Sequence, residues 1–190
     1  MSILQRLPES VIACGREYAI NTDFRVWIEV EKLIFDKSVP YAERIAGMFV
    51  LALTEPPKGD PAKLAERLLE FCFGSDVQNH AREDGAGSKA VFDYDEDAEY
   101  IYSAFLGEFG IDLTTEPLHW HKFKALLKSL GEGCKFSKIV GYRSTDTAKI
   151  KDKEQRRFYE SMKRLYSLPD RRTDDEKEAD LVEGLGMFFL

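Results

Sequence analysis

Apolar positions recur at helical spacing along most of this 190-residue chain, separated by polar and glycine-rich segments. The clearest pattern comes from two successive stretches rich in aromatic residues. The first predicts a helix that begins near Tyr94 and ends at Gly110. The second predicts a helix capped by Thr114 or Thr115 and ending at Gly131. Because the connector is short, we expect an antiparallel pair of helices, with the aromatic side chains in the core.

The beginning of the chain predicts a β-hairpin followed by a helix. Within residues 10–20, two short apolar runs flank Gly15–Arg16, and the glycine suits the conformation of a tight turn. The cluster of capping residues at 21–23 precedes the stretch 24–35, whose apolar positions fit a helix. The same positions also allow a strand, so the pattern alone leaves both interpretations open.

The remaining helices are predicted from caps, prolines and apolar spacing. One is expected at 40–54 with Ser38 as its cap, and another at 60–73. A short basic helical turn is expected at 135–142, and a strongly charged helix at 151–168. Four side chains should form the inner face of that last helix: Phe158, Met162, Leu165 and Tyr166.

These elements define a mainly α protein, a helical domain with a small N-terminal β-hairpin. Residues 1–73 should hold the hairpin and the first helices. The polar, glycine-rich segment 74–90 is interpreted as a flexible linker, and residues 91–169 as a second helical part. Residues 170–190 combine a charged run with an apolar end.

Composition and charge narrow the class of protein. The net charge of -7 at pH 7 argues against a nucleic-acid partner, because phosphate contacts need a basic surface. The three cysteines show no metal or redox spacing, which is typical of reduced thiols in a cytosolic protein. No apolar run approaches a membrane span, and no signal peptide is recognisable. We therefore expect a soluble, cytoplasmic protein.

Two groups of residues could carry chemistry, but both have a simpler interpretation. His119 and His121 are candidate metal ligands, yet an i, i+2 pair on a helix points to opposite sides. The carboxylates of 93–97 resemble a calcium loop, but Ala98 stands where such a loop needs glycine. Negative charge at a helix start explains the acidic run. We therefore predict no catalytic residue, no metal site and no cofactor.

The sequence also allows two alternative functions. One is a metal-dependent hydrolase that uses His119, His121 and the carboxylates of Asp93 to Asp97. The other is a DNA-binding regulator whose recognition helix lies in the region Lys135 to Arg143, although the net charge argues against it.

The apolar end of the chain suggests a surface for other proteins. Leu181, Leu185 and Phe188 lie at i, i+4 and i+7, and Phe189 follows them. This segment either docks back onto the domain or binds a subunit or partner. We interpret Leu181, Leu185, Phe188 and Phe189 as the candidate partner-binding residues.

Several short motifs point to one family. In the two central helices they comprise Phe92, Tyr94, Asp97, Ala98, Ile101, Tyr102 and Phe105, then Ile111 to Leu113, then Leu118 to Trp120 with Lys122 and Phe123. Residues 20–25, 142–144 and 151–154 add further matches. With these motifs the chain, from about residue 10 to 169, resembles a small family from long-tailed bacteriophages of Gram-positive bacteria and their prophages.

This resemblance implies a function without catalysis. Members of the family occupy the gene position of tail assembly chaperones. The resemblance therefore implies an oligomeric assembly factor in the host cell cytoplasm. It would coat the tape-measure protein and recruit tail-tube protein subunits around it. No binding residue can be transferred from the family to this chain.

Overall fold

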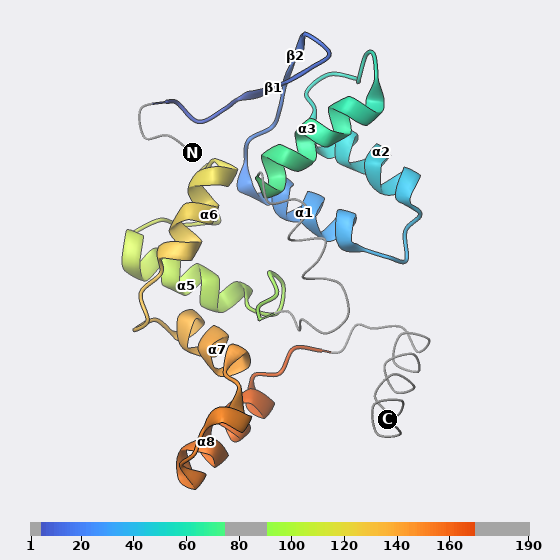
Figure 1. The fold of residues 1–190 in the computed structure, drawn as a ribbon. Coiled ribbons are helices and arrows are strands. Elements are labelled where there is room, and N and C mark those ends of the chain that lie inside the picture. Colours follow the sequence, from blue (N-terminus) through green and yellow to red (C-terminus); the bar gives the residue numbers. More distant parts are fainter. Residues whose placement is uncertain (1–4, 75–90, 170–190) are drawn as a thin grey trace, which may run out of the picture. The chain divides into compact units, whose positions relative to one another are not determined.

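The computed structural model describes residues 5–74 and 91–169 (Figure 1). Most of these residues are helical, and a single two-stranded antiparallel hairpin precedes the helices within the described ranges. The predicted fold class is therefore confirmed. The chain divides into two compact units, residues 1–140 and residues 141–190, and each is described by itself below.

The hairpin consists of β1 (Ser10–Ala13) and β2 (Arg16–Ala19). Ala13 pairs with Arg16, so the turn is formed by Cys14 and Gly15, one residue earlier than the predicted centre at Gly15–Arg16. Both turn residues have positive φ angles, 50° for Cys14 and 74° for Gly15. Two successive positive φ angles match the twist of a two-residue hairpin, and glycine adopts them without steric cost.

Three helices follow the hairpin, and two of them begin where the capping residues predict. They are α1 (Phe24–Phe35), α2 (Tyr41–Ala52) and α3 (Pro61–Phe73). The Asp23 carboxylate accepts the N–H of Arg25 in α1, and the Asp60 carboxylate accepts the N–H groups of Ala62 and Lys63 in α3. The helix interpretation of residues 24–35 is thus confirmed over the strand.

The predicted cap of α2 was wrong. The backbone N–H and the hydroxyl of Ser38 both donate to the Asp36 carboxylate, at 2.9 and 2.6 Å. Ser38 therefore belongs to the turn that ends α1. Pro40 stands at the cap position of α2, without a side-chain hydrogen bond. Proline suits this place because it has no N–H group that would need a partner.

Residues 91–169 contain four more helices and a short 3-10 turn, mostly near the predicted positions. They are α5 (Ala98–Phe109), α6 (Trp120–Ser129), α7 (Lys135–Ser144), η1 (Thr147–Lys149) and α8 (Lys153–Leu165). The connector between α5 and α6 is longer than expected, because the predicted caps Thr114 and Thr115 do not start a helix. The Asp112 carboxylate binds the N–H and the hydroxyl of Thr114, which closes a separate turn.

The core of residues 1–140 is built around Phe123 of α6. Its ring stacks on Phe24 of α1 at 4.6 Å and on Phe105 of α5 at 5.2 Å between ring centroids. Trp120 lies 6.0 Å away on the same helix and is fully buried. Residues before and after the predicted linker therefore share one hydrophobic core. The linker itself lies outside the described residues, apart from Gly74, and stays a prediction.

The second unit contains an aromatic contact between Tyr142 and α8. The Tyr142 ring lies about 6 Å from the rings of Phe158, Tyr159 and Tyr166. The prediction that Phe158, Met162, Leu165 and Tyr166 form an inner face was nevertheless wrong. None of the residues of α8, all of which are described, is buried. Too few apolar residues lie within 141–169 to cover this face.

Candidate functional site

Side chains at the start of α6 bind the last carbonyl groups of α3. The Nε2 atom of His121 donates to the Phe71 carbonyl oxygen at 2.8 Å. The Nε1 atom of Trp120 donates to the Cys72 carbonyl oxygen at 2.9 Å, and the Lys124 ammonium group donates to the same oxygen. The final turn of a helix has free carbonyl groups and a partial negative charge, so these donors stabilise the end of α3.

His119 uses both ring nitrogens in backbone hydrogen bonds. Its Nδ1 atom accepts the N–H of His121 at 3.1 Å and thereby caps α6. Its Nε2 atom lies 3.0 Å from the Pro8 carbonyl oxygen. Because a carbonyl oxygen only accepts, Nε2 must carry the proton. The neutral ring therefore has no lone pair left for a metal ion.

The argument that the two histidines point to opposite sides was wrong. Their ring centroids lie 5.3 Å apart. The helical angle of 100° per residue does not describe this pair, because His119 precedes α6 and has an extended backbone. The prediction of structural histidines rests instead on the hydrogen bonds of their rings. Both rings also contact Phe71, and His121 stacks on it at 4.4 Å.

A cluster of polar side chains lies beside this contact, where α1, α3 and α6 meet. We call Glu31, Tyr94, Lys124 and Cys72 the interior polar cluster. The Tyr94 hydroxyl donates a hydrogen bond to the Glu31 carboxylate, and the Lys124 ammonium group attracts the same carboxylate. The charge on Lys124 also lies 4.7 Å from the centre of the Trp120 ring. Each of these side chains thus has a charged or hydrogen-bonding neighbour in the cluster.

Burial dominates the protonation behaviour of this cluster. It raises the pKa of Glu31 to about 7, despite the opposing effects of Lys124 and Tyr94. It also lowers the pKa of Lys124 and raises the pKa of Tyr94. Each shift favours the uncharged form of the group, as expected where little water is available. Cys72 is fully buried, whereas Glu31, Tyr94 and Lys124 are half-buried, so water has limited access to the cluster.

Cys72 lacks the environment of a nucleophilic cysteine. Its side chain is fully buried, and burial raises the pKa of the thiol well above its ordinary value, to which the charge of Glu31 contributes. Reactive cysteines need the opposite, a thiolate stabilised by positive charge and reached by substrate. We interpret Cys72 as a packing residue.

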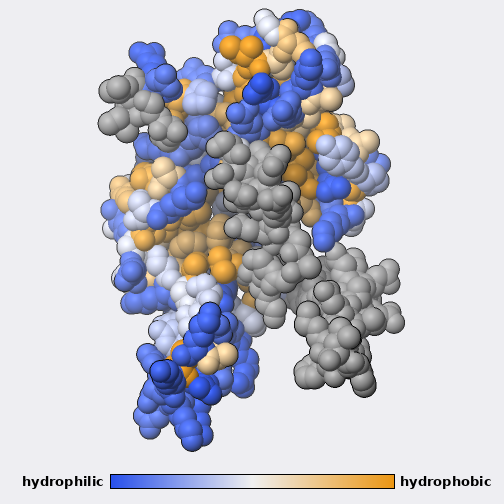
Figure 2. All heavy atoms as spheres, viewed as in Figure 1, coloured by the Kyte–Doolittle hydropathy of each residue, from blue (hydrophilic) through white to orange (hydrophobic). Residues whose placement is uncertain are grey.

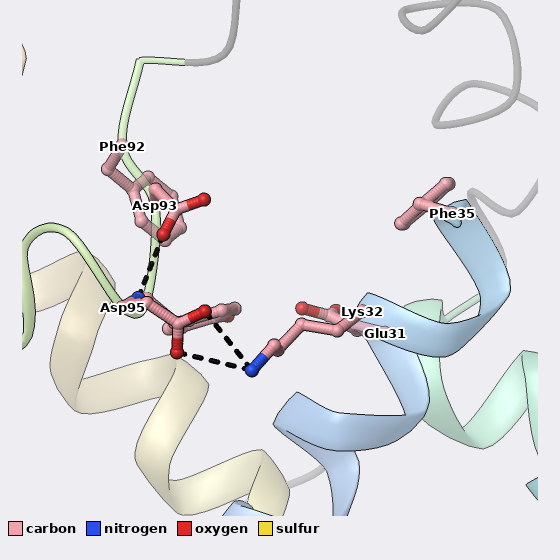
Figure 3. Close-up of a pocket in the computed structure, with 7 residues that line it drawn as sticks. Glu31, Lys32, Phe35, Phe92, Asp93 and Asp95 are labelled. Atoms are coloured by element: carbon pink, nitrogen blue, oxygen red, sulfur yellow. Dashed lines mark hydrogen bonds and ion pairs between the residues drawn. The ribbon is translucent and has the colours of Figure 1, made fainter. Parts of the chain in front are cut away.

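A small pocket of about 160 Å³ opens between α1 and the segment before α5 (Figure 3). Glu31, Lys32 and Phe35 line it from α1, and residues 92–95 line it from the other side. Figure 3 shows the Lys32 ammonium group reaching across to the Asp95 carboxylate, at 3.1 Å. An ion pair thus occupies the polar side of the pocket, and the remaining wall is largely aromatic.

The acidic run before α5 binds backbone N–H groups. The Asp93 carboxylate accepts from the N–H of Asp95 and of Glu96, at 2.8 and 3.0 Å. Asp97, which is fully buried, accepts the N–H of Asp93 at 3.0 Å. These bonds stabilise the turn that leads into α5. The predicted helix start near Tyr94 was therefore wrong, because the acidic run forms this turn and the helix begins only at Ala98.

The sequence-predicted and observed sites differ. Leu181, Leu185, Phe188 and Phe189, the predicted partner-binding residues, lie outside the described part of the chain. Within residues 5–74 and 91–169, three or more His, Cys, Asp or Glu side chains nowhere converge as a metal site would require. Sequence reasoning missed the interior polar cluster. Its one visible signal was Glu31, an acidic residue among the apolar positions of the first predicted helix.

These features define a helical protein whose histidines and central polar side chains hold the elements together. Among the described residues, none of the helices combines the length and apolar character that crossing a bilayer requires. Residues 3–168 match the family described as Bacteriophage Gp15 protein, so the chain belongs to this family of bacteriophage proteins. The comparisons with curated proteins and with solved structures found no match.

Proposed function

We propose that the protein is a non-catalytic chaperone of phage tail assembly, which binds the tape-measure protein and the tail-tube protein. It acts as a homo-oligomer in the host cell cytoplasm. The observation that carries this proposal is its membership of a bacteriophage family over residues 3–168. The motifs shared with proteins in the gene position of tail assembly chaperones narrow the phage function to this role, in phages of Gram-positive bacteria.

The use of the polar side chains supports a role without catalysis. His119, His121 and Lys124 bind backbone groups that end or begin a helix. The Cys72 thiol is buried and has a raised pKa. The residues that most resemble catalytic groups thus have structural partners already. A chaperone needs none of them for chemistry and depends instead on surfaces that bind other chains.

The partner contact is proposed at the apolar end of the chain. Leu181, Leu185, Phe188 and Phe189 would contact another subunit or the tape-measure protein, as an apolar helix face contacts a groove. The acidic net charge of -7 keeps such an oligomer soluble while it covers an aggregation-prone partner.

Co-expression with the tape-measure protein encoded by the same phage tests this proposal. Affinity purification of the tagged chaperone should recover the tape-measure protein in the soluble fraction. The double change Leu181→Asp and Leu185→Asp should reduce recovery, because it places charge on the proposed contact face. Ala179→Asp is the matched control, since on a helix position 179 lies away from the four proposed contact residues. If the two wild-type proteins never associate, the functional proposal is wrong.

Elemental analysis of the purified protein tests the absence of catalytic metal. We expect no stoichiometric zinc or manganese, because both histidines bind backbone groups. A stoichiometric content of either metal would contradict the non-catalytic proposal and support the metal-dependent hydrolase.

A further inference from the structure

Helix α8 exposes an apolar ridge that the rest of the described second unit leaves open. The ridge consists of Phe158, Met162 and Leu165, at i, i+4 and i+7. The exposed fractions of Phe158 and Leu165 are 49% and 66%, and Met162 is half-buried. Figure 2 shows that the surface around α8 is mostly polar and contains a small apolar area. A ridge of this kind on a charged helix is a typical contact surface for a second apolar helix face.

Positively charged side chains lie beside the ridge. Arg157 and Arg164 are exposed beside it, and neither forms an ion pair with a carboxylate of the described ranges 5–74 and 91–169. Residues 141–169 contain eight Lys or Arg and four Asp or Glu, a net charge of +4. This part of an otherwise acidic chain therefore attracts an acidic partner.

The segment that follows α8 has the complementary character. Residues 170–190 contain seven Asp or Glu and three Lys or Arg, a net charge of -4. Their apolar positions Leu181, Leu185 and Phe188 repeat the i, i+4, i+7 spacing of the ridge. An acidic segment with a matching apolar face therefore lies in the chain next to a basic helix with an exposed ridge.

The chain is long enough for this segment to reach the ridge. Helix α8, with 13 residues, is about 20 Å long, and the described part ends at residue 169, four residues after the helix. Residues 170–180 can span up to about 36 Å when extended, so Leu181 can reach any point of the ridge. A short connection also gives the segment a high effective concentration at its own α8, which favours it over a second copy.

We propose that residues 170–190 fold back on α8 of the same chain. In this arrangement Leu181, Leu185 and Phe188 cover the ridge. The acidic residues of 174–183 lie beside Arg157 and Arg164. The docked segment runs antiparallel to α8, as the second helix of a helical hairpin does. The inference describes the chain before it meets any partner, and it does not depend on the proposed function.

Photo-crosslinking in the full chain tests this docking. The photoreactive analogue p-benzoylphenylalanine replaces Phe158, whose half-exposed ring leaves room for the change. Irradiation followed by peptide mass spectrometry should find crosslinks to residues 181–190 of the same chain. The analogue at Glu160, which is exposed on the other side of α8, is the control and should give no such crosslink. The analogue at Leu165 provides a second position on the ridge.

Mixing isotope-labelled and unlabelled chains identifies which chain supplies the segment. Crosslinks within one isotopic species are expected, whereas mixed crosslinks would show that a second copy covers the ridge and would overturn the proposal. Missing crosslinks from both Phe158 and Leu165 to residues 181–190 would also overturn it. Neither result depends on whether the tape-measure protein co-purifies, so this proposal and the proposed function can fail separately.

Charge reversal tests the electrostatic part of the docking. Arg157→Glu combined with Arg164→Glu should reduce the intrachain crosslink about threefold, as expected for the loss of two exposed ion pairs. Lys128→Glu is the control, because Lys128 is exposed on α6 and lies outside the second unit. An unchanged yield in the double variant would contradict the proposed contacts of the two arginines.

Discussion

At the scale of single residues, Glu31 is a half-buried carboxylate with a strongly raised pKa. It lies on α1 among apolar neighbours and receives a hydrogen bond from the Tyr94 hydroxyl. Burial raises its pKa to about 7, from an ordinary value of 4.5. The folded protein therefore keeps this proton at pH values at which the unfolded chain has already released it. Between these two values, the contribution of Glu31 to the free energy of unfolding falls as the pH rises.

Glu31→Gln should remove this pH dependence. Glutamine has no proton to lose, and its side-chain oxygen can still accept the Tyr94 hydroxyl. The free energy of unfolding of the variant minus that of wild type should increase by about 2 kcal/mol from pH 5 to pH 8. Urea unfolding at both pH values measures this difference.

Glu29→Gln is the control for this measurement. Glu29 lies on the same helix, but its side chain is 57% exposed and pairs with Lys32. Its stability difference from wild type should stay nearly constant between pH 5 and pH 8. If Glu31→Gln behaves in the same way, Glu31 is ionised in the folded protein and the assigned pKa is wrong.

His119 is a capping residue, which its sequence context concealed. Ser, Thr, Asp and Asn are the usual caps, and the nearby Thr114 and Thr115 suggested an earlier helix start. Two interactions determine that the helix is capped by His119. Asp112 binds Thr114 in the connector, and the Pro8 carbonyl group near the chain start contacts the His119 ring. Contacts between distant segments of this kind are not encoded in local spacing.

His119→Ala should lower the free energy of unfolding by about 1 kcal/mol, because it leaves the N–H of His121 without its acceptor. His119→Asn keeps a side-chain acceptor at the cap and should lose less. Chemical unfolding of the two variants measures the difference. Equal losses in both would show that the ring contacts, and not the cap, determine the effect.

At the scale of elements, local signals predicted the helices best where a cap and an apolar face agree. Asp23 and Asp60 begin α1 and α3 as expected, because each side chain reaches free N–H groups of its own helix. The apolar face of α8 was predicted equally well as a pattern, but it was wrongly placed in the interior. Spacing shows that a helix has two faces, whereas burial depends on how much apolar surface the rest of the unit offers.

The turn of the hairpin gives a prediction at this scale. Cys14 adopts a φ angle of 50°, which is unfavourable for most side chains, and its side chain is exposed. Asparagine tolerates this angle and is preferred before glycine in two-residue hairpin turns. Cys14→Asn should therefore raise the free energy of unfolding by about 0.5 kcal/mol, whereas Cys14→Val should lower it. Thermal unfolding of both variants provides the measurement, and a stabilising valine would contradict the turn assignment.

At the scale of the whole molecule, the mainly α class and most element positions could be predicted from apolar spacing, caps and prolines. The residues of the interior polar cluster could not be predicted. The cluster of Glu31, Tyr94, Lys124 and Cys72 brings together four segments that are distant in sequence, and no local pattern predicts such a meeting. Family membership supplies the phage context, and the assembly role remains the functional proposal.

The most direct test of the proposed role is the native mass of the soluble material obtained by co-expression with the tape-measure protein. Light scattering coupled to size exclusion should show an assembly that contains the tape-measure protein and several copies of this chain. The Leu181→Asp, Leu185→Asp variant should give smaller assemblies, whereas Ala179→Asp should behave as wild type. A tape-measure protein that stays insoluble, together with a monomeric mass for this chain, would contradict the account.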